Sequence, residues 1–183
     1  VFRLEDAIST EMNTDIGGIK SKLLARGDRY GVASDLTTNE AYDKVSRSTV
    51  MEVEAQIDTL FSRIVKAMND VYCPNVESKD AITSVDGTVY PAGTKILDAD
   101  NCARGVDGKL PPRELFTRVG VDRYTEVTGT DGKTYYIYNE EDPNNTSTMY
   151  SIGSVSINSD LKRQITLMPA YTANGAVDYD FGH

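Results

Sequence analysis

The sequence predicts an α+β fold in which a long antiparallel helical hairpin packs beside a β-hairpin and loop-rich region. In the first third of the chain, apolar residues recur at steps of three and four, which places them on one helix face. From residue 75 the pattern changes to alternating β-formers around Asp-Gly turns, which is typical of hairpins. We therefore predict a helical hairpin over 1–74, a β-hairpin and loop-rich insertion over 75–148, and a short strand, short helix and polar tail over 149–183.

The first arm of the predicted helical hairpin lies in residues 1–30. Its apolar side chains are spaced by three or four residues: Val1, Leu4, Ile8, Met12, Ile16, Ile19 and Leu23. Gly17 and Gly18 interrupt this pattern, and each costs about 1 kcal/mol in a helix relative to Ala. We therefore expect the helix to restart there, with Asp15 as its N-cap and Gly27 as its left-handed C-cap.

The second arm, over residues 47–72, has the most regular periodicity in the chain. Steps of three and four alternate without a miss and form a heptad seam: Val50, Val53, Ile57, Leu60, Ile64, Ala67 and Val71. Ser46 or Ser48 is the predicted N-cap, and Pro74 ends the helix. Because such a seam needs a long partner surface, we expect this helix to pair antiparallel with the helix over 16–27.

Three later segments predict β-structure. Residues 84–90 and 125–138 are alternating β-formers, each with an Asp-Gly turn, and we predict a hairpin for each. Residues 149–157 alternate again and predict a strand, and residues 158–167 predict a short helix.

Composition and charge exclude several classes of protein. A formal net charge of −9 disfavours binding to nucleic acid and to anionic membranes. No apolar run reaches the length of a membrane span. The chain starts at Val1 without a basic and apolar leader, so we expect no cleaved signal peptide and interpret the chain as an excised fragment. Its one histidine, His183, is the last residue, so no His-based triad or multi-histidine metal site is expected.

We predict no catalytic, cofactor-binding or metal-binding residue. In the loop over 98–107, Asp98 and Asp100 fit the first two ligand positions of a calcium loop. Arg104, however, falls near its centre and Lys109 replaces the closing Glu. We therefore expect a solvated turn and no response to calcium.

Two further motifs have ordinary structural explanations. Arg26-Gly27-Asp28 spells an adhesion tripeptide, but it lies where a helix should end, which gives the glycine a backbone role. Glu140 and Glu141 could suggest acid–base chemistry. Adjacent residues of an extended chain point to opposite sides, however, and we expect a solvated loop there.

Six segments of the chain are similar to segments of one known family. Residues 15–28 are similar to a family segment that runs from Gly-Gly through Leu-Leu to Arg and Asp. Residues 53–71 are similar to the helix that follows it, and Asn69 matches an Asn near the end of that helix. Residues 115–118 resemble a Leu-Phe element beyond that helix. Three more segments look like the variant found in clostridia-like bacteria: residues 122–125, 138–143 and 150–153. Together these segments resemble hook-associated protein 1, a family of bacterial flagellar proteins.

The resemblance implies a structural subunit of the hook–filament junction, not an enzyme, with no cofactor. It also implies export through the flagellar type III apparatus to an extracellular site, and partners among the hook, junction and filament proteins. Family members begin and end with long helices that polymerise, and the sequence here has neither, so we expect a soluble monomer. A long insertion between Asn69 and Phe116 replaces the short Gly-rich link of better-known members.

The two cysteines, Cys73 and Cys102, allow two interpretations. They are either unrelated thiols, with Cys73 packed at a helix end, or one disulfide that staples the insertion to the helix. Because the resemblance implies an extracellular protein, in which oxidation is permitted, we expect the disulfide.

An extracellular adhesin or ligand-binding module is the alternative function, and the tyrosines distinguish the two. If Tyr90, Tyr135, Tyr136 and Tyr138 are exposed together on one face, binding is favoured, because clustered surface aromatics mark interaction sites. If they are divided between core and solvent, the structural function is favoured.

Overall fold

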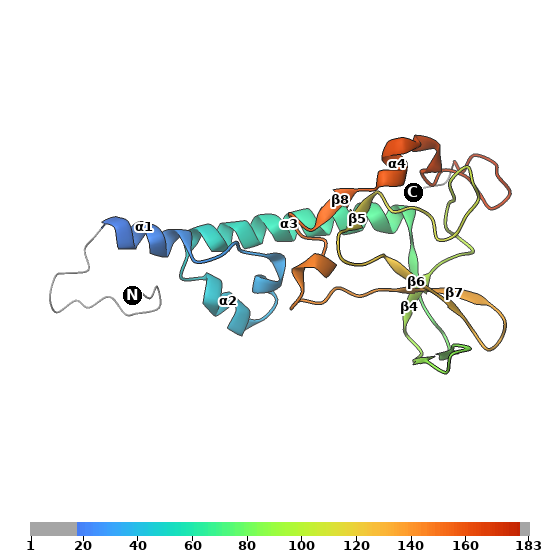
Figure 1. The fold of residues 1–183 in the computed structure, drawn as a ribbon, viewed down its shortest axis with the longest axis horizontal. Helices are drawn as coiled ribbons and strands as arrows, with labels where there is room; N and C mark the ends of the chain where they lie inside the picture. The colour runs from blue at the N-terminus through green and yellow to red at the C-terminus, as the bar shows by residue number, and fades with distance from the viewer. Residues whose placement is uncertain (1–17, 180–183) are drawn as a thin grey trace. The chain divides into compact units, whose positions relative to one another are not determined.

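The structure is a computed structural model, and it describes residues 18–179 (Figure 1). It has four α-helices in this range, of which only one is long: α1 (Gly18–Arg26), α2 (Asn39–Val45), α3 (Thr49–Tyr72) and α4 (Ser159–Arg163). Short 3₁₀ turns add η1 (Ala33–Leu36), η2 (Thr146–Thr148) and η3 (Ile165–Leu167). The chain forms two compact units that divide within α3, one up to Arg63 and the other from Ile64 onward.

The strands form three small antiparallel sheets. The largest has four strands in the order β1 (Asn75–Glu77), β4 (Lys95–Leu97), β7 (Thr134–Tyr138) and β6 (Tyr124–Thr128). Two pairs complete the set: β2 (Ile82–Thr83) with β3 (Val89–Tyr90), and β5 (Phe116–Arg118) with β8 (Val155–Ile157). The hairpin predicted over 125–138 is confirmed as β6–β7. A hairpin also forms around the Asp86-Gly87 turn, as β2–β3, but its first strand is Ile82–Thr83, before the predicted start at residue 84. Gly87 and Gly132, in their turns, have the positive φ that an Asp-Gly turn requires.

The predicted long antiparallel helical hairpin is wrong. α3 is the only long helix among residues 18–179, and α1, with nine residues, is too short to cover its 24. The helix itself ends where predicted: Ser48 is its N-cap and accepts from the N–H of Met51, and α3 stops two residues before Pro74. Asp15, the predicted cap of the first helix, lies outside the described residues.

Within the first unit, polar contacts hold the segment before α2 against one face of α3. The Ser48 hydroxyl donates to the Ala25 carbonyl at 2.8 Å, which fixes the end of α1. The N–H groups of Gly31 and Ala33 donate to the carboxylates of Glu54 and Asp58 at 3.0 and 2.8 Å. These bonds lay the segment between α1 and α2 along the helix.

In the second unit, the four-stranded sheet carries an apolar cluster on each face. On one face, Cys73, Leu97, Cys102 and Tyr124 are buried together. On the other face, Ile82, Val127 and Ile137 are buried. Because β7 alternates between these clusters, its successive side chains are divided between them.

Candidate protein-interaction surface

The heptad seam of α3 points to solvent. Its seven residues are all exposed in the structure: Val50, Val53, Ile57, Leu60, Ile64, Ala67 and Val71. The exposed fraction of the six larger side chains runs from 42% at Val50 to 61% at Leu60. Met68, which adjoins the seam, is also exposed. We call the seven seam residues the α3 stripe. Because each residue lies three or four positions after the last, the stripe follows one face of the helix.

The opposite face of α3 is the one that the fold buries. Small and polar side chains dominate it: Met51, Ala55, Asp58, Ser62, Val65 and Asn69. The side chains of Asp58 and Asn69 bond to backbone N–H groups of other segments, which satisfies them away from water. The Met51 N–H donates to the Ser48 hydroxyl at the start of the helix. The buried face of α3 therefore mixes small, polar and apolar side chains, while the exposed face carries a row of apolar side chains.

The exposed apolar stripe has the character of an interaction surface. Scattered single hydrophobic residues on a protein surface are ordinary, but contiguous rows of them are found at interaction sites. Full burial of one large aliphatic side chain is worth about 1.5–3 kcal/mol. Six half-exposed side chains could therefore contribute about 5 kcal/mol or more to an association that covers them, before the cost of association.

A buried polar cluster joins α3 to the strands of the second unit. The Asn69 side chain donates to the Phe116 carbonyl at 2.8 Å and accepts from the Phe116 N–H at 3.0 Å. It also donates to the Glu114 carboxylate, which accepts from the Tyr150 hydroxyl at 2.6 Å. The Arg123 guanidinium donates to the Tyr150 hydroxyl and to the Cys73 carbonyl. Burial raises the pKa of Glu114 and of Tyr150. These groups satisfy one another inside the fold, so we interpret the cluster as structural.

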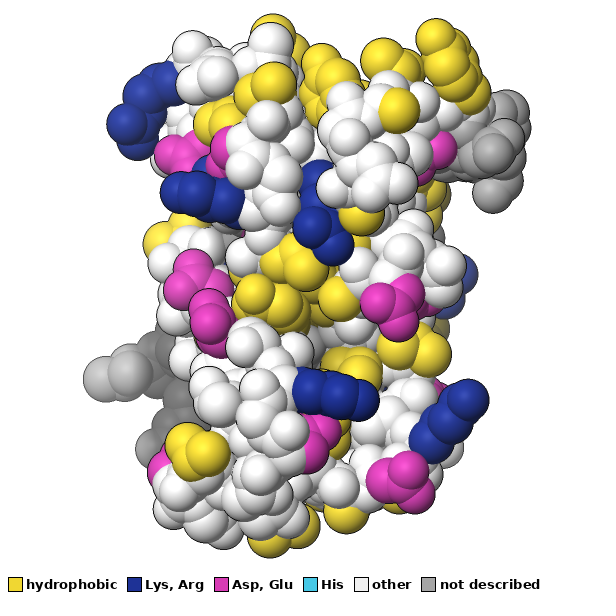
Figure 2. Space-filling model, turned by 90° about the vertical axis from the view of Figure 1, so that its right-hand side faces the viewer, with side chains coloured by type: hydrophobic (Ala, Val, Ile, Leu, Met, Phe, Trp, Pro, Cys, Tyr) yellow, Lys and Arg dark blue, Asp and Glu magenta, His cyan; other side chains and the backbone are white. Residues whose placement is uncertain are grey.

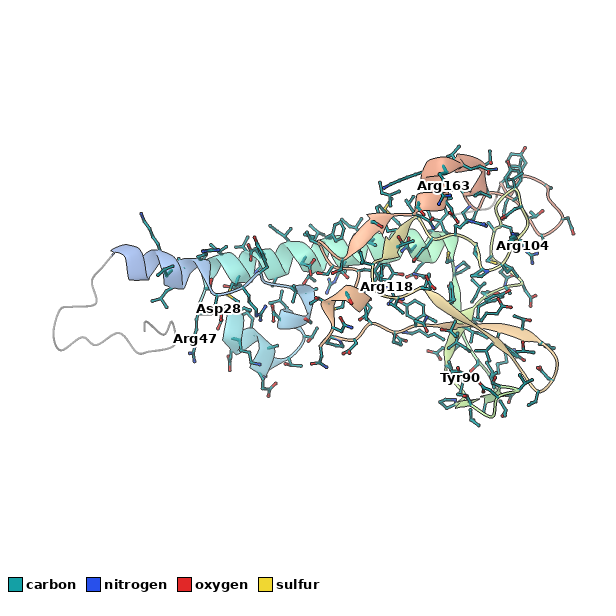
Figure 3. The ribbon with its side chains drawn as sticks, in the orientation of Figure 1. Asp28, Arg47, Tyr90, Arg104, Arg118 and Arg163 are labelled. Carbon is teal, nitrogen blue, oxygen red and sulfur yellow. The ribbon has the colours of Figure 1, made fainter. Side chains whose placement is uncertain are left out.

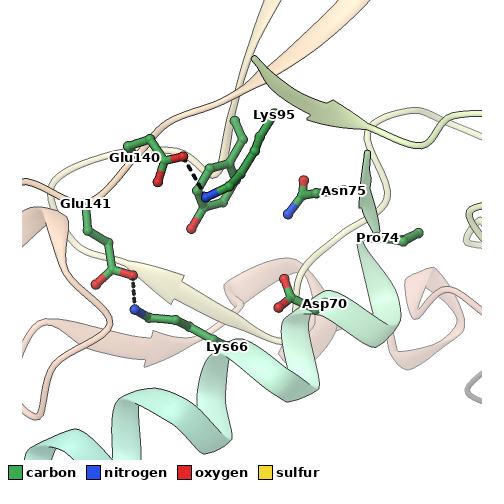
Figure 4. A pocket seen from close by; sticks show the side chains of 8 residues that line it. Lys66, Asp70, Pro74, Asn75, Lys95, Glu140 and Glu141 are labelled. Carbon is green, nitrogen blue, oxygen red and sulfur yellow. Dashed lines mark hydrogen bonds and ion pairs between the residues drawn. The ribbon is translucent and has the colours of Figure 1, made fainter. Parts of the chain in front are cut away.

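The second unit also contains a polar cavity of about 460 Å³ (Figure 4). Its lining includes two ion pairs, Lys66 with Glu141 and Lys95 with Glu140, the second at 2.9 Å. Glu140 and Glu141, considered in the sequence as an acid–base pair, therefore each pair with a different lysine. Their carboxylates do not converge on one point in the cavity.

Charged side chains of both signs are mixed on the outer surface of the second unit. On the face that Figure 2 shows, Lys and Arg side chains alternate with Asp and Glu, with hydrophobic side chains between them. None of the described helices is long and apolar enough to span a membrane. Within the same residues, no three His, Cys, Asp or Glu side chains gather in a way that could hold a metal ion.

The four hairpin tyrosines are divided between the two faces of the sheet. Tyr136 and Tyr138 pack against the cluster around Cys73 and Tyr124. Tyr90, which Figure 3 labels on β3, packs with Tyr135 against the cluster around Ile137. All four are partly buried. They do not form the common exposed patch that the adhesin alternative required.

The adhesion tripeptide and the acidic loop both make local contacts within the protein. Gly27 follows the last residue of α1 with φ of +81°, and its N–H donates to the Leu23 carbonyl, as in a left-handed helix cap. Asp98 accepts from the backbone N–H and the side-chain amide of Asn101, and Asp107 pairs with Arg113 at 2.7 Å. Protein groups therefore contact the carboxylates of Asp98 and Asp107. His183 lies outside the described residues.

The predicted disulfide is absent, since Cys73 and Cys102 are both free thiols. Both are buried in the cluster with Leu97 and Tyr124, and the Cys73 thiol donates to the Pro112 carbonyl at 3.3 Å. The thiols therefore serve as small apolar packing groups, which was the alternative left open in the sequence.

We expect both thiols to be free, but to react slowly with thiol reagents in the folded protein. Burial raises the pKa of Cys73 and of Cys102, which suppresses the reactive thiolate. A thiol reagent should therefore find two free thiols per chain in denaturant without reductant, and react only slowly in native buffer. A count of zero thiols in denaturant would show that the disulfide forms after all.

Sequence reasoning found the stripe residues but assigned them to the core. The buried polar cluster was not predicted, although Asn69, Phe116, Arg123 and Tyr150 lie in segments that carry the resemblance. The chain matches no protein-family model, no curated protein and no solved structure in the three comparisons made.

Proposed function

We propose that this chain is a structural, non-catalytic part of a bacterial flagellum, a hook-associated protein at the hook–filament junction. The observation that carries the proposal is the α3 stripe, because an uncovered heptad face suits a subunit that works by packing against other helices. The flagellar assignment itself depends on the sequence resemblance. In this proposal the protein is exported without a cleaved signal peptide and lies outside the cell.

The buried polar cluster supports the proposal, because it is built largely from segments that carry the resemblance. Asn69 bonds to Phe116 of the Leu-Phe element. Arg123 and Tyr150 come from two of the other matched segments and bond to each other. Matched segments far apart in sequence therefore meet in one place in the fold.

The alternative of an adhesin or ligand-binding module gains nothing from the geometry. Its expected surface was a joint patch of exposed tyrosines, and the four tyrosines instead pack on opposite faces of one sheet. Proteins that bind through aromatic patches keep those side chains accessible. We therefore retain the structural function alone.

Immunogold electron microscopy of the bacterium that encodes the chain tests the proposal. An antibody against this chain should label one point on each flagellum, between hook and filament. Deletion of the gene should leave hooks in place and release filament subunits into the medium, with loss of motility. Label along the cell surface or inside the cell, or normal motility of the deletion strain, would contradict the proposal.

A further inference from the structure

We propose that the α3 stripe binds the same stripe of a second copy of this chain, as a parallel two-stranded coiled coil. The inference rests on the proposed function only in taking the stripe as an interaction surface, and it does not need the flagellar assignment. Sequence analysis expected a monomer. The exposure of all seven stripe residues is the reason to infer a dimer instead.

The a positions of the stripe, and Leu60 among its d positions, have the residue types of a parallel pair. In heptad terms the a positions are all β-branched: Val50, Ile57, Ile64 and Val71. The d positions are Val53, Leu60 and Ala67, with Leu60 at the centre. In parallel coiled coils, β-branched residues at a combined with Leu at d favour two strands. Three heptads of this kind span about 30 Å of helix.

The flanking positions add no like-charge repulsion to that pairing. A parallel coiled coil places each g residue beside the e residue of the next heptad of its partner. Here that gives Thr49 with Glu54, Gln56 with Phe61, and Arg63 with Met68. None of these pairs brings two charges of the same sign together, although the whole chain carries a formal net charge of −9.

Residues 1–16 of the same chain are the competing candidate to cover the stripe, and the spacing of their apolar residues suits the stripe less well. These apolar residues follow mostly four-residue steps: Val1, Leu4, Ile8, Met12 and Ile16. Such a spacing drifts away from a strict seven-residue repeat. The segment also has four acidic side chains against one basic side chain, beside a helix that is itself net acidic.

Light scattering on the full chain over a dilution series tests the dimer. The wild type should show twice the 20.1 kDa chain mass and dissociate on dilution. Leu60→Glu should weaken the dimer by roughly 100-fold or more, because it would bury an unpaired carboxylate from each copy. Since Leu60 is exposed in the single chain, far-ultraviolet circular dichroism should show the same helix content. Ile57→Glu gives an independent repeat.

Val119→Glu is the matched control, because Val119 is 70% exposed and lies in a loop outside the stripe. It should dimerise like the wild type. A wild type that stays monomeric at every concentration would overturn the proposal. So would a Val119→Glu effect equal to that of Leu60→Glu.

Cysteine cross-linking tests the orientation and the competing occupant. Val53→Cys should form a disulfide-linked dimer in air, because a parallel pair in register places the two Val53 positions opposite each other; the wild type, with its buried thiols, should not. In an antiparallel pair a d position faces an a position of the partner. Linkage only in a mixture of Val53→Cys with Ile64→Cys or Val71→Cys would therefore indicate an antiparallel pair and contradict the proposal. A monomer whose Val53→Cys thiol becomes reactive only after deletion of residues 1–16 would assign the stripe to that segment instead.

Discussion

Replacing Asn69 by Leu should lower the free energy of unfolding by about 3–5 kcal/mol. The substitution removes three hydrogen bonds at a fully buried site, two to the backbone of Phe116 and one to Glu114. Each buried group left without a partner costs about 1–3 kcal/mol. The effect should be large because Asn69 itself is fully buried and its partner Phe116 begins β5. Urea unfolding, followed by circular dichroism, measures it.

Gln56→Leu is the control for this prediction. Gln56 lies on the same helix but is exposed, so the same change of polar amide to Leu should shift stability by no more than about 0.5 kcal/mol. If Asn69→Leu also remained within about 1 kcal/mol of the wild type, the buried cluster would not hold α3 to the strands as described.

Gly31→Ala should destabilise the first unit by about 2–3 kcal/mol. A Cβ at this position would lie 1.9 Å from the carbonyl oxygen of Met51 and 2.9 Å from the backbone nitrogen of Ala55. Both atoms belong to the backbone of α3, which cannot move aside as a flexible side chain would, and overpacking of this kind typically costs 1–3 kcal/mol or more. The hydrogen bond from Gly31 to Glu54 would be strained at the same time.

Amide hydrogen exchange at Ala33 reports this effect locally, because its N–H bonds to Asp58 in the same segment. Exchange there should accelerate in Gly31→Ala and remain unchanged in Gly18→Ala. A Cβ at Gly18 meets no atom within 4 Å, and Ala suits a helix better than Gly. Equal protection of Ala33 in Gly31→Ala and the wild type would contradict the close packing of this segment on α3.

Local elements could be read from the sequence because local chemistry determines them. The N-cap at Ser48, the helix end before Pro74 and the Asp-Gly turns each depend on residues a few positions apart. The face that α3 buries could not be predicted in the same way. A heptad seam looks the same in sequence whether its partner lies inside the fold or outside it, and the burial of Asp58 and Asn69 depends on partners far along the chain.

The buried polar cluster was beyond sequence reasoning for a related reason. Asn69 and Glu114 lie 45 residues apart, and Arg123 lies 27 from Tyr150. The spacing of such residues in the sequence does not predict that they are in contact. The thiols show the same limit, since two cysteines can share one apolar cluster and remain free. In both cases the decisive fact is a contact between distant segments.

The central claim is that α3 turns its heptad seam outward and packs the opposite face into the fold, and two adjacent residues test it most directly. Ile64 is 51% exposed and Val65 is 2% exposed, on the same turn of one helix. The test is the free energy of unfolding of Ile64→Ala and of Val65→Ala, obtained by urea unfolding at concentrations where the chain is monomeric. Val65→Ala should lose roughly 2 kcal/mol, as a buried truncation does, and Ile64→Ala no more than about 0.5 kcal/mol. The reverse order, with the larger loss at Ile64, would contradict the account.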